Sequence, residues 1–300
     1  MESNEQTTDR LPRFVRHRFR KPEFVIQPRD CEIVRVVSQH RVISSDDLQL
    51  LVAGSNQTIL RRLQKLFHHG YLDRPRVQRM RGNTPMVYAI GQKGAELLAR
   101  ESGGQPTADW SEKNRQLGAS YLEHALMVSR FQAALRFALQ AQGRAAVERW
   151  HSDGAIRDAV SVEHAASTER IAVAPDAFFT LRLLNEPEGG NRVHVFLEAD
   201  RGTMTTKRFL NKVRGYWHWW RSGRQEQLGI NNFLVLTVTS TPERAASLCA
   251  VCAGLDAPRH RGLRMFLFGS ERTYAQGEPL RVLDQVWATP GEKDRHSLLE

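Results

Sequence analysis

Between residues 29 and 99 the chain contains a close succession of short amphipathic segments separated by turn signals, and this succession constrains the fold more than any other feature. Apolar residues at helical spacing predict a helix over about residues 29–39, followed by a short extended step at 42–43. Ser44 with Asp47 three residues later forms a capping-box pattern, which predicts that a second, short helix begins there. The first half of this segment is therefore expected to hold two helices joined by a tight connection.

A third helix is predicted to follow directly. Gly54 supplies a turn, Ser55 can cap the helix, and apolar residues then recur every three or four positions as far as Phe67. The other side of this helix is polar and basic, as expected for a helix that reads the edges of DNA bases. The candidate DNA-binding residues on it are Ser55, Asn56, Gln57, Arg61, Arg62 and Lys65.

A β-hairpin is predicted after the third helix. Gly70 ends the helix, residues 71–72 start a strand, and residues 86–90 supply the return strand. Three helices and a hairpin in this order are typical of a winged helix-turn-helix, in which one helix enters the major groove and the hairpin loop contacts the flanking backbone. Guanidinium groups suit such contacts because they stay charged and offer paired donors. The loop carries four of them, at Arg74, Arg76, Arg79 and Arg81.

The positive charge of the chain is concentrated in this part. Residues 1–100 contain 18 Lys plus Arg and 10 Asp plus Glu, a net charge of +8, whereas the remaining 200 residues contain 25 and 23, a net charge of +2. A cationic domain releases counterions when it binds a duplex, so this asymmetry favours double-stranded DNA as the partner. The alternative is a winged helix used for protein contacts, with its basic residues forming an ordinary solvated face.

Composition and soft segments indicate the domain organisation. A chain of 300 residues with 41% hydrophobic residues is long enough for two globular domains. No apolar run reaches membrane-spanning length and the amino terminus lacks a secretory signal pattern, so no membrane contact and a cytoplasmic location are expected. The expected organisation is a disordered basic arm at 1–24, a DNA-binding domain at 25–100, a linker at 101–111, a second domain at 112–290 and a tail at 291–300.

The second domain alternates helices and strands. A long helix over about 115–142 is followed by three strands, a helix, a strand, a helix and a strand. A strand meander followed by a βαβ crossover predicts a mixed sheet flanked by helices, the core order of restriction-endonuclease-like folds, and a mixed α/β (α+β) class. The strands are expected near 145–150, 177–184, 193–198, 233–239 and 263–268, and the two later helices at 205–221 and 242–254.

Acidic residues lie on both sides of the turn-rich segment 186–191, which is expected to join two of these strands as a hairpin. Asp176, at the start of one strand, then comes almost opposite Glu198, at the end of the other, with β-carbons roughly 5 Å apart. Two carboxylates at that separation repel unless a cation or a proton lies between them, and hard oxygen ligands favour Mg²⁺ or Mn²⁺. Asp176, Glu198 and Asp200 are the candidate metal ligands, and such a metal could activate water for phosphodiester cleavage.

Three short motifs together resemble the bacterial replication-relaxation protein family. They are Pro175-Asp176-Ala177, the segment Phe196-Leu197-Glu198-Ala199-Asp200-Arg201-Gly202-Thr203, and Lys212 with Tyr216. The resemblance covers most of the chain and includes the winged helix and His124 in the long helix. It implies a DNA-binding protein of plasmids or mobile elements, associated with replication, relaxation or transfer and with partner proteins in those processes. It also implies a carboxy-terminal domain similar to PD-(D/E)XK nucleases.

The chain departs from the pattern of an active nuclease at one position, because Asp200 stands two residues after Glu198, where a catalytic Lys is expected. Without that ammonium group another donor must position the attacking water and stabilise the developing charge. Lys212 is the best substitute, since it lies on the apolar, sheet-facing side of its predicted helix. The alternative is a structural Lys212 that pairs with Glu198 or Asp200.

Two functional classes follow from these observations. The preferred hypothesis is a site-specific DNA-binding regulator or accessory factor with a degenerate nuclease-like domain, which needs no cofactor to bind DNA. The rival hypothesis is an endonuclease or nickase dependent on Mg²⁺ or Mn²⁺, with Asp176, Glu198 and Lys212 as its catalytic residues. A homodimer is compatible with either class, because many winged-helix proteins bind palindromic sites as dimers.

Overall fold

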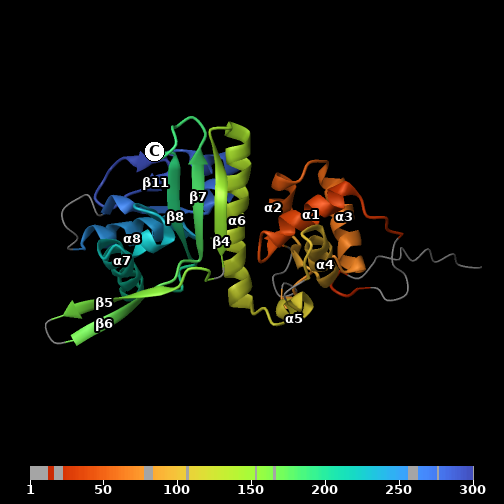
Figure 1. The fold of residues 1–300 in the computed structure, drawn as a ribbon, viewed down its shortest axis with the longest axis horizontal. Coiled ribbons are helices and arrows are strands. Elements are labelled where there is room, and N and C mark those ends of the chain that lie inside the picture. The colour runs from red at the N-terminus through yellow and green to blue at the C-terminus, as the bar shows by residue number, and fades with distance from the viewer. Residues whose placement is uncertain are drawn as a thin grey trace, which may run out of the picture. The chain divides into compact units, whose positions relative to one another are not determined.

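The computed structural model describes residues 13–16, 23–77, 84–105, 108–152, 154–164, 167–255, 263–275 and 277–299. The chain divides into two compact units between Ser129 and Arg130, inside the long helix α6 (Ala119–Gln142). The first unit is mainly helical, and the second contains a large sheet (Figure 1).

The first unit holds each helix and strand that the sequence predicts between residues 29 and 99. Its elements are α1 (Pro28–Ser38), β1 (Ile43–Ser44), α2 (Ser45–Leu51), α3 (Asn56–His69), β2 (Leu72–Asp73), β3 (Val87–Ile90) and α4 (Gln92–Glu101), and α5 (Trp110–Arg115) follows. The strands form a small antiparallel sheet in the order β1-β3-β2. The hairpin loop between β2 and β3 includes residues 78–83, which lie outside the described part of the chain.

Local signals account for where these helices begin and end. The Ser44 hydroxyl accepts a hydrogen bond from the Asp47 backbone N–H at 3.1 Å, and the Ser55 hydroxyl accepts one from the Thr58 N–H at 3.4 Å. Both serines thereby satisfy a backbone donor that the first helical turn leaves unpaired. Gly70 ends α3 with a φ of 84°, a left-handed conformation that glycine adopts without a steric penalty.

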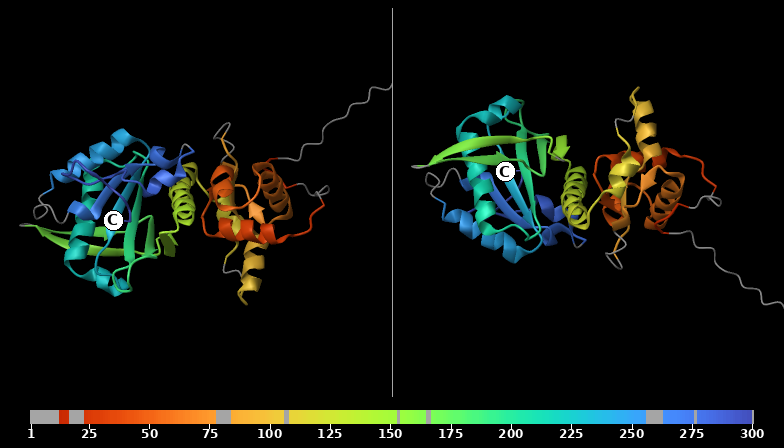
Figure 2. Two further views of the ribbon diagram at one scale, coloured as in Figure 1. Left: turned by 90° about the horizontal axis from the view of Figure 1, so that it is seen from above. Right: turned by 90° about the horizontal axis from the view of Figure 1, so that it is seen from below.

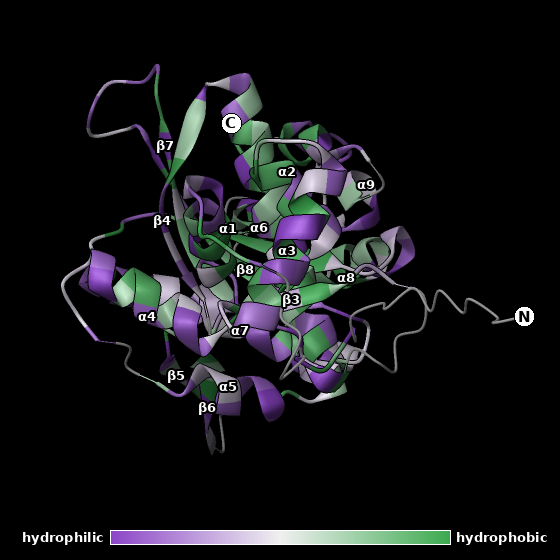
Figure 3. Ribbon diagram, turned by 90° about the vertical axis from the view of Figure 1, so that its right-hand side faces the viewer, coloured by the Kyte–Doolittle hydropathy of each residue, from purple (hydrophilic) through white to green (hydrophobic). Residues whose placement is uncertain are grey.

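The apolar sides of the first three helices form one core. Ile33 of α1, Leu48 of α2 and Leu63 of α3 are fully buried in it, together with Tyr88 of β3. Hydrophobic and hydrophilic bands alternate along α3 (Figure 3), as its amphipathic sequence requires. The polar side of α3 is therefore not used by this core.

The second unit is built on a mixed sheet, as the sequence predicts, but the sheet has seven strands where five were expected. Its strands are β4 (Ala145–Ser152), β7 (Ala177–Leu183), β8 (Arg192–Asp200), β9 (Leu234–Thr239), β10 (Phe266–Ser270), β11 (Trp287–Ala288) and β12 (Arg295–His296), in the order β12-β11-β10-β9-β8-β7-β4. β8, β9 and β10 are parallel, and their crossovers contain α7 (Thr206–Arg221) and α8 (Pro242–Ala253). The remaining neighbours in the sheet are antiparallel.

Helices cover both faces of this sheet (Figure 2). On one face, Phe131 of α6 contacts Phe179 of β7, with ring centroids 5.8 Å apart. On the other face, Phe196 of β8 contacts Tyr216 and Trp219 of α7, with ring centroids 5.7 and 5.5 Å apart. Successive side chains of a strand point to opposite faces of the sheet, so those of β8 face the helices on both sides. The second half of β8 is therefore buried on both sides.

A second hairpin, β5 (Asp158–His164) and β6 (Ser167–Val173), extends from the sheet (Figure 1) and is absent from the sequence-based prediction. It packs on α7, where a Cβ added at Gly215 would lie 2.9 Å from Ile171. The indole N–H of Trp219 donates to Asp158 at 2.8 Å. α7 is therefore buried by the sheet and by this hairpin, which is why Trp219 is a core residue.

The carboxy-terminal segment belongs to the second unit. After η3 (Leu263–Met265) and β10 come α9 (Arg272–Ala275), η4 (Pro279–Leu283), β11 and β12. The expected tail at 291–300 instead contributes β12, which pairs with β11, and Leu298 is only 1% exposed. Such a short strand carries too few residues for a period-two pattern to reveal it.

Candidate functional site

The hairpin of β7 and β8 brings Asp176 and Glu198 together. Ala177 pairs with Leu197 in the antiparallel register, so the preceding and following residues, Asp176 and Glu198, lie opposite each other. The Asp176 N–H donates to the Leu197 carbonyl at 3.0 Å, and the Asp176 carboxylate accepts from the Ala199 N–H at 2.8 Å. The backbone of β8 therefore holds the Asp176 side chain beside Glu198.

Two residues of α7, one turn apart, reach Glu198. The Tyr216 hydroxyl donates to Glu198 Oε1 at 2.6 Å, and Lys212 Nζ forms a close ion pair with Glu198 Oε2. The Glu198 side chain is 6% exposed and the Lys212 side chain is 25% exposed. The structure thus places Lys212 on the sheet-facing side of its helix, and each oxygen of Glu198 accepts a hydrogen bond from α7.

Burial dominates the electrostatics of this cluster. It raises the pKa of Glu198 to about 7, although the charge of Lys212 opposes the shift, and the charge of Asp176 adds to it. Burial also acts to lower the pKa of Lys212, but the negative charges of Glu198 and Asp176 outweigh it and the pKa is raised. Burial raises the pKa of Tyr216 well above its ordinary value, so its hydroxyl remains a donor.

Asp200 faces a different partner. Its Oδ2 accepts from Nε and Nη2 of Arg244, on α8, at 3.0 and 2.7 Å, and its Oδ1 accepts from the Gly202 N–H at 2.6 Å. Arg244 also donates to the Met204 carbonyl at 2.7 Å. Asp200 therefore fixes the loop between β8 and α7, and the 4% exposure of its side chain marks it as a structural ion pair.

Two of the three carboxylates predicted as metal ligands already have cationic partners within the described part of the chain. No group of three or more His, Cys, Asp or Glu side chains within the described part of the chain is arranged to hold a metal. Lys212 already supplies a cation to Glu198, and Arg244 supplies one to Asp200. Two opposed carboxylates need a cation or a proton, and here an ammonium group and the raised pKa of Glu198 meet that need.

The residues expected to contact DNA separate into three groups. Ser55, Asn56, Gln57, Arg61 and Arg76 are exposed, although the Ser55 hydroxyl also caps α3. Arg62, Lys65 and Arg74 are less exposed and donate to groups within the chain, and Arg79 and Arg81 lie outside the described residues. Arg62 pairs with Asp30, whose side chain is fully buried. Arg74 is 7% exposed and donates to the Tyr88 hydroxyl at 2.9 Å. Arg62 and Arg74 are therefore better explained as structural residues.

Three further residues, which were not predicted to contact DNA, lie on or near the exposed side of α3. Leu60 is 42% exposed, and Gln64 follows it by one turn on the same side of α3 as Arg61. The Arg29 guanidinium lies 3.4 Å from the position that a Cβ of Gly54 would occupy, beside the turn that precedes α3. Helical spacing from Gln57 would have indicated Leu60 and Gln64, but nothing local in the sequence indicates Arg29.

Part of the expected disordered arm is placed against the first unit. Arg16 donates to the carbonyls of Phe67 and Leu72, both at 3.0 Å, and to the Asp73 carboxylate at 3.2 Å. Lys65 donates to the Glu23 carbonyl at 3.1 Å. The described parts of the arm thus contact the end of α3 and β2, and this tertiary contact explains the difference from the expectation.

Comparison with protein families decides the relationship that the motifs suggested. The model of the Replication-relaxation family matches residues 34–234, which is more than half of the chain. This chain belongs to the Replication-relaxation family. The segment matched by the family model includes α3 and also Asp176, Glu198 and Lys212, so both candidate sites lie inside it.

Other comparisons add no relative. The searches of curated proteins and of solved structures each found no match to this member of the Replication-relaxation family. Among the described residues no helix has the length and apolar character needed to span a bilayer.

Proposed function

We propose that this chain binds double-stranded DNA through the exposed side of α3 and acts as a regulator or accessory factor in the replication or relaxation of a plasmid or mobile element. The observation that carries the proposal is that Asn56, Gln57 and Arg61 are exposed together on a helix whose other side is buried. Amide and guanidinium groups are the donors and acceptors that pair with adenine and guanine edges in the major groove.

The elements around α3 support this orientation. Three helices followed by the β2–β3 hairpin are typical of a winged helix-turn-helix, in which the helix equivalent to α3 enters the major groove. Exposed Arg76 after β2, and Arg29 beside the turn before α3, suit contacts with flanking phosphates, as do Arg79 and Arg81 in the loop. The net charge of +8 in residues 1–100 supplies long-range attraction to the duplex.

We assign the second unit a structural or partner-binding role without catalysis. Its mixed sheet with successive βαβ crossovers is consistent with a nuclease-like ancestry. The hydrogen bonds from Lys212 and Tyr216 to Glu198 join α7 to the sheet. A buried carboxylate held in this way is suited to stabilising the fold, because two charge-assisted hydrogen bonds fix its position against α7.

The test is a titration of duplex binding against salt. Each phosphate contact that is lost should reduce the slope of log affinity against log salt by about 1, and each lost base contact should cost about 1–3 kcal/mol on a selected sequence. Arg76→Ala is expected to reduce the slope, and Gln57→Ala is expected to lower the preference for a duplex selected from a random pool. Arg100→Ala, an exposed arginine on α4, is the matched control. Equal effects of Arg76→Ala and Arg100→Ala would refute the assignment.

The opposition of Asp176 and Glu198 keeps a metal-dependent nickase as the second candidate. This activity would require a divalent ion to bind beside Lys212, on the lone pairs of Asp176 and Glu198 that their hydrogen-bond donors leave open. It predicts nicking of supercoiled plasmid in Mg²⁺ or Mn²⁺, abolished by EDTA and by Asp176→Ala. An intact plasmid with the wild-type chain across several substrates would support the non-catalytic assignment, and DNA binding by α3 is measured separately from this result.

A further inference from the structure

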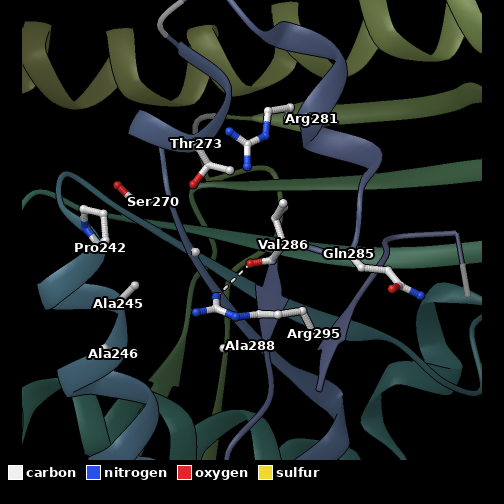
Figure 4. Close-up of a pocket in the computed structure, with 11 residues that line it drawn as sticks. Pro242, Ala245, Ala246, Ser270, Thr273, Arg281, Gln285, Val286, Ala288 and Arg295 are labelled. Carbon is white, nitrogen blue, oxygen red and sulfur yellow. Dashed lines mark hydrogen bonds between the residues drawn. The ribbon is translucent and has the colours of Figure 1, made fainter. Parts of the chain in front are cut away.

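The second unit contains a cavity of about 310 Å³ that lies outside the segment matched by the family. Its walls come from α8, from the end of β10, and from the carboxy-terminal segment between η4 and β12 (Figure 4). A volume of this size is at the lower end of the range found for small-molecule sites, about 300–1,000 Å³. The cavity is thus large enough for a small organic ligand.

Two arginines from different elements enter this cavity. Arg281 comes from η4 and its guanidinium is directed towards Thr273, while Arg295 comes from β12 and lies beside Val286 (Figure 4). The residues that line the cavity include no Asp or Glu. Two guanidinium groups facing one space without an acidic neighbour in its wall create a positive potential, which favours an anionic ligand.

The partners of these arginines leave donors for a ligand. Arg295 Nη1 donates to the Val286 carbonyl at 2.9 Å, which orients the guanidinium and leaves its other N–H groups as further donors. Arg281 pairs with Glu278 at 2.9 Å, but the two side chains are 50% and 62% exposed. An exposed pair of this kind contributes little, so a ligand can replace it at small cost.

The remaining wall suits a phosphate group. Thr273 of α9 places a side chain beside the Arg281 guanidinium (Figure 4), and Ser270, which is 2% exposed, lines the cavity while its hydroxyl accepts from the Arg272 N–H at 3.2 Å. Ala245 and Ala246 of α8 give a small, apolar part of the wall (Figure 4). Guanidinium and hydroxyl groups around one space form the usual donor set for a phosphate, and the apolar wall leaves room for a ring or sugar attached to it.

We propose that this cavity binds the phosphate group of a small ligand, up to the size of a mononucleotide, with Arg281 and Arg295 as the phosphate-binding residues. The site belongs to the second unit and shares no residue with α3, so neither its residues nor its ligand is expected to be needed for duplex binding. The arginines recognise the phosphate group by its charge, and the alanine wall can contact a ring attached to it. Inorganic phosphate lacks that second contact and should therefore bind more weakly than a mononucleotide.

The test is isothermal titration calorimetry of the full chain with inorganic phosphate, with adenosine monophosphate and with adenosine. Saturable binding of the monophosphate, weaker binding of phosphate and no binding of adenosine are expected. Arg281→Gln and Arg295→Gln should each weaken monophosphate binding by about tenfold or more, about 1.4 kcal/mol. Arg221→Gln, at the exposed end of α7 and away from the cavity, should leave it unchanged.

A further variant guards against loss of the fold. Arg295→Gln removes the contact with Val286, so Ala246→Glu is made at an exposed helical position, where it adds a negative charge and fills space without removing any contact. It should abolish monophosphate binding while the thermal unfolding midpoint and duplex binding stay at wild-type values. No saturable binding, equal binding by all variants, or an equal loss in Arg221→Gln would each overturn the proposal.

Discussion

The hydroxyl of Tyr216 donates a 2.6 Å hydrogen bond to Glu198, which is buried between α7 and the sheet beside an apolar core. Lys212 occupies the other oxygen of the same carboxylate. A polar group inside a core stabilises one arrangement of helix and strand only when its partners are complete. The cluster of Glu198, Lys212 and Tyr216 therefore helps to determine how α7 packs on the sheet.

Removal of Lys212 should be costly unless Glu198 is neutralised as well. Lys212→Met leaves a buried carboxylate without its cation, and we expect a loss of about 3 kcal/mol in the free energy of unfolding at neutral pH. Glu198→Gln combined with Lys212→Met should recover much of this loss, because no buried charge remains. Urea unfolding of the two single variants and the double variant measures the coupling. Strictly additive losses would show that the two side chains do not depend on each other.

Titration of Glu198 should be visible in the pH dependence of stability. Its pKa is raised from 4.5 to about 7 in the folded chain, so the folded state binds the proton more tightly than the unfolded state. Protonation of Glu198 contributes fully to the free energy of unfolding below pH 4.5. This contribution falls as the pH rises to about 7, and above that pH the free energy of unfolding no longer depends on Glu198 titration. The loss is of the order of 3 kcal/mol. The difference in unfolding free energy between wild type and Glu198→Gln should change across this window; a constant difference would contradict the pKa shift.

Adjacent arginines on α3 should behave differently. Arg62→Ala leaves the fully buried Asp30 carboxylate without its cation, and we expect a loss of about 3 kcal/mol or more in unfolding free energy. Arg61→Ala removes an exposed side chain and should change stability by less than about 0.5 kcal/mol while weakening duplex binding. Chemical unfolding and filter binding of both variants separate the two roles. Equal destabilisation by the two variants would be inconsistent with the Asp30 pair.

The hairpin on α7 should depend on Asp158. The hydrogen bond from Arg224 lowers the pKa of Asp158 to about 2, even though burial opposes the shift, and Trp219 contributes a further hydrogen bond. This stabilisation is present above pH 3.8 and is lost as the pH falls towards about 2. Asp158→Asn should lower the unfolding free energy at neutral pH by about 1 kcal/mol, since the site is partly exposed. Glu278→Gln, in an exposed pair, is the control, and an equal effect of both in thermal unfolding would contradict the role of Asp158.

Local patterns were sufficient for most elements of the fold. The helices from α1 to α4 begin and end within a few residues of the predicted positions, because Ser44, Ser55 and Gly70 act on neighbouring backbone groups only. The β5–β6 hairpin was missed although Val160, Val162, Ile171 and Val173 alternate with small or polar residues and are buried. Its strands lie on a helix and outside the main sheet, and this position depends on Gly215, which the alternation does not reveal.

The candidate site was predictable only in part. A hairpin register can be read from its turn, so the opposition of Asp176 and Glu198 followed from the sequence. The pairing of Asp200 with Arg244 did not follow, because the two residues belong to different elements 44 positions apart. In the same way, Arg62 and Arg74 had the composition of a DNA-binding surface, and only their packing against Asp30 and Tyr88 assigns them to the interior.

The sequence by itself determined the secondary structure of the first unit, the mixed sheet of the second, and the two acidic strand ends, because caps, turns and periodicity act over a few residues. The tertiary structure decided which charged groups are paired: Lys212 with Glu198, Arg244 with Asp200 and Arg62 with Asp30. Whether a buried charge has a partner depends on contacts between distant segments, and the free energy of burying it depends on that partner. For this reason the chemistry of the acidic cluster became apparent only when α7 was placed against β8.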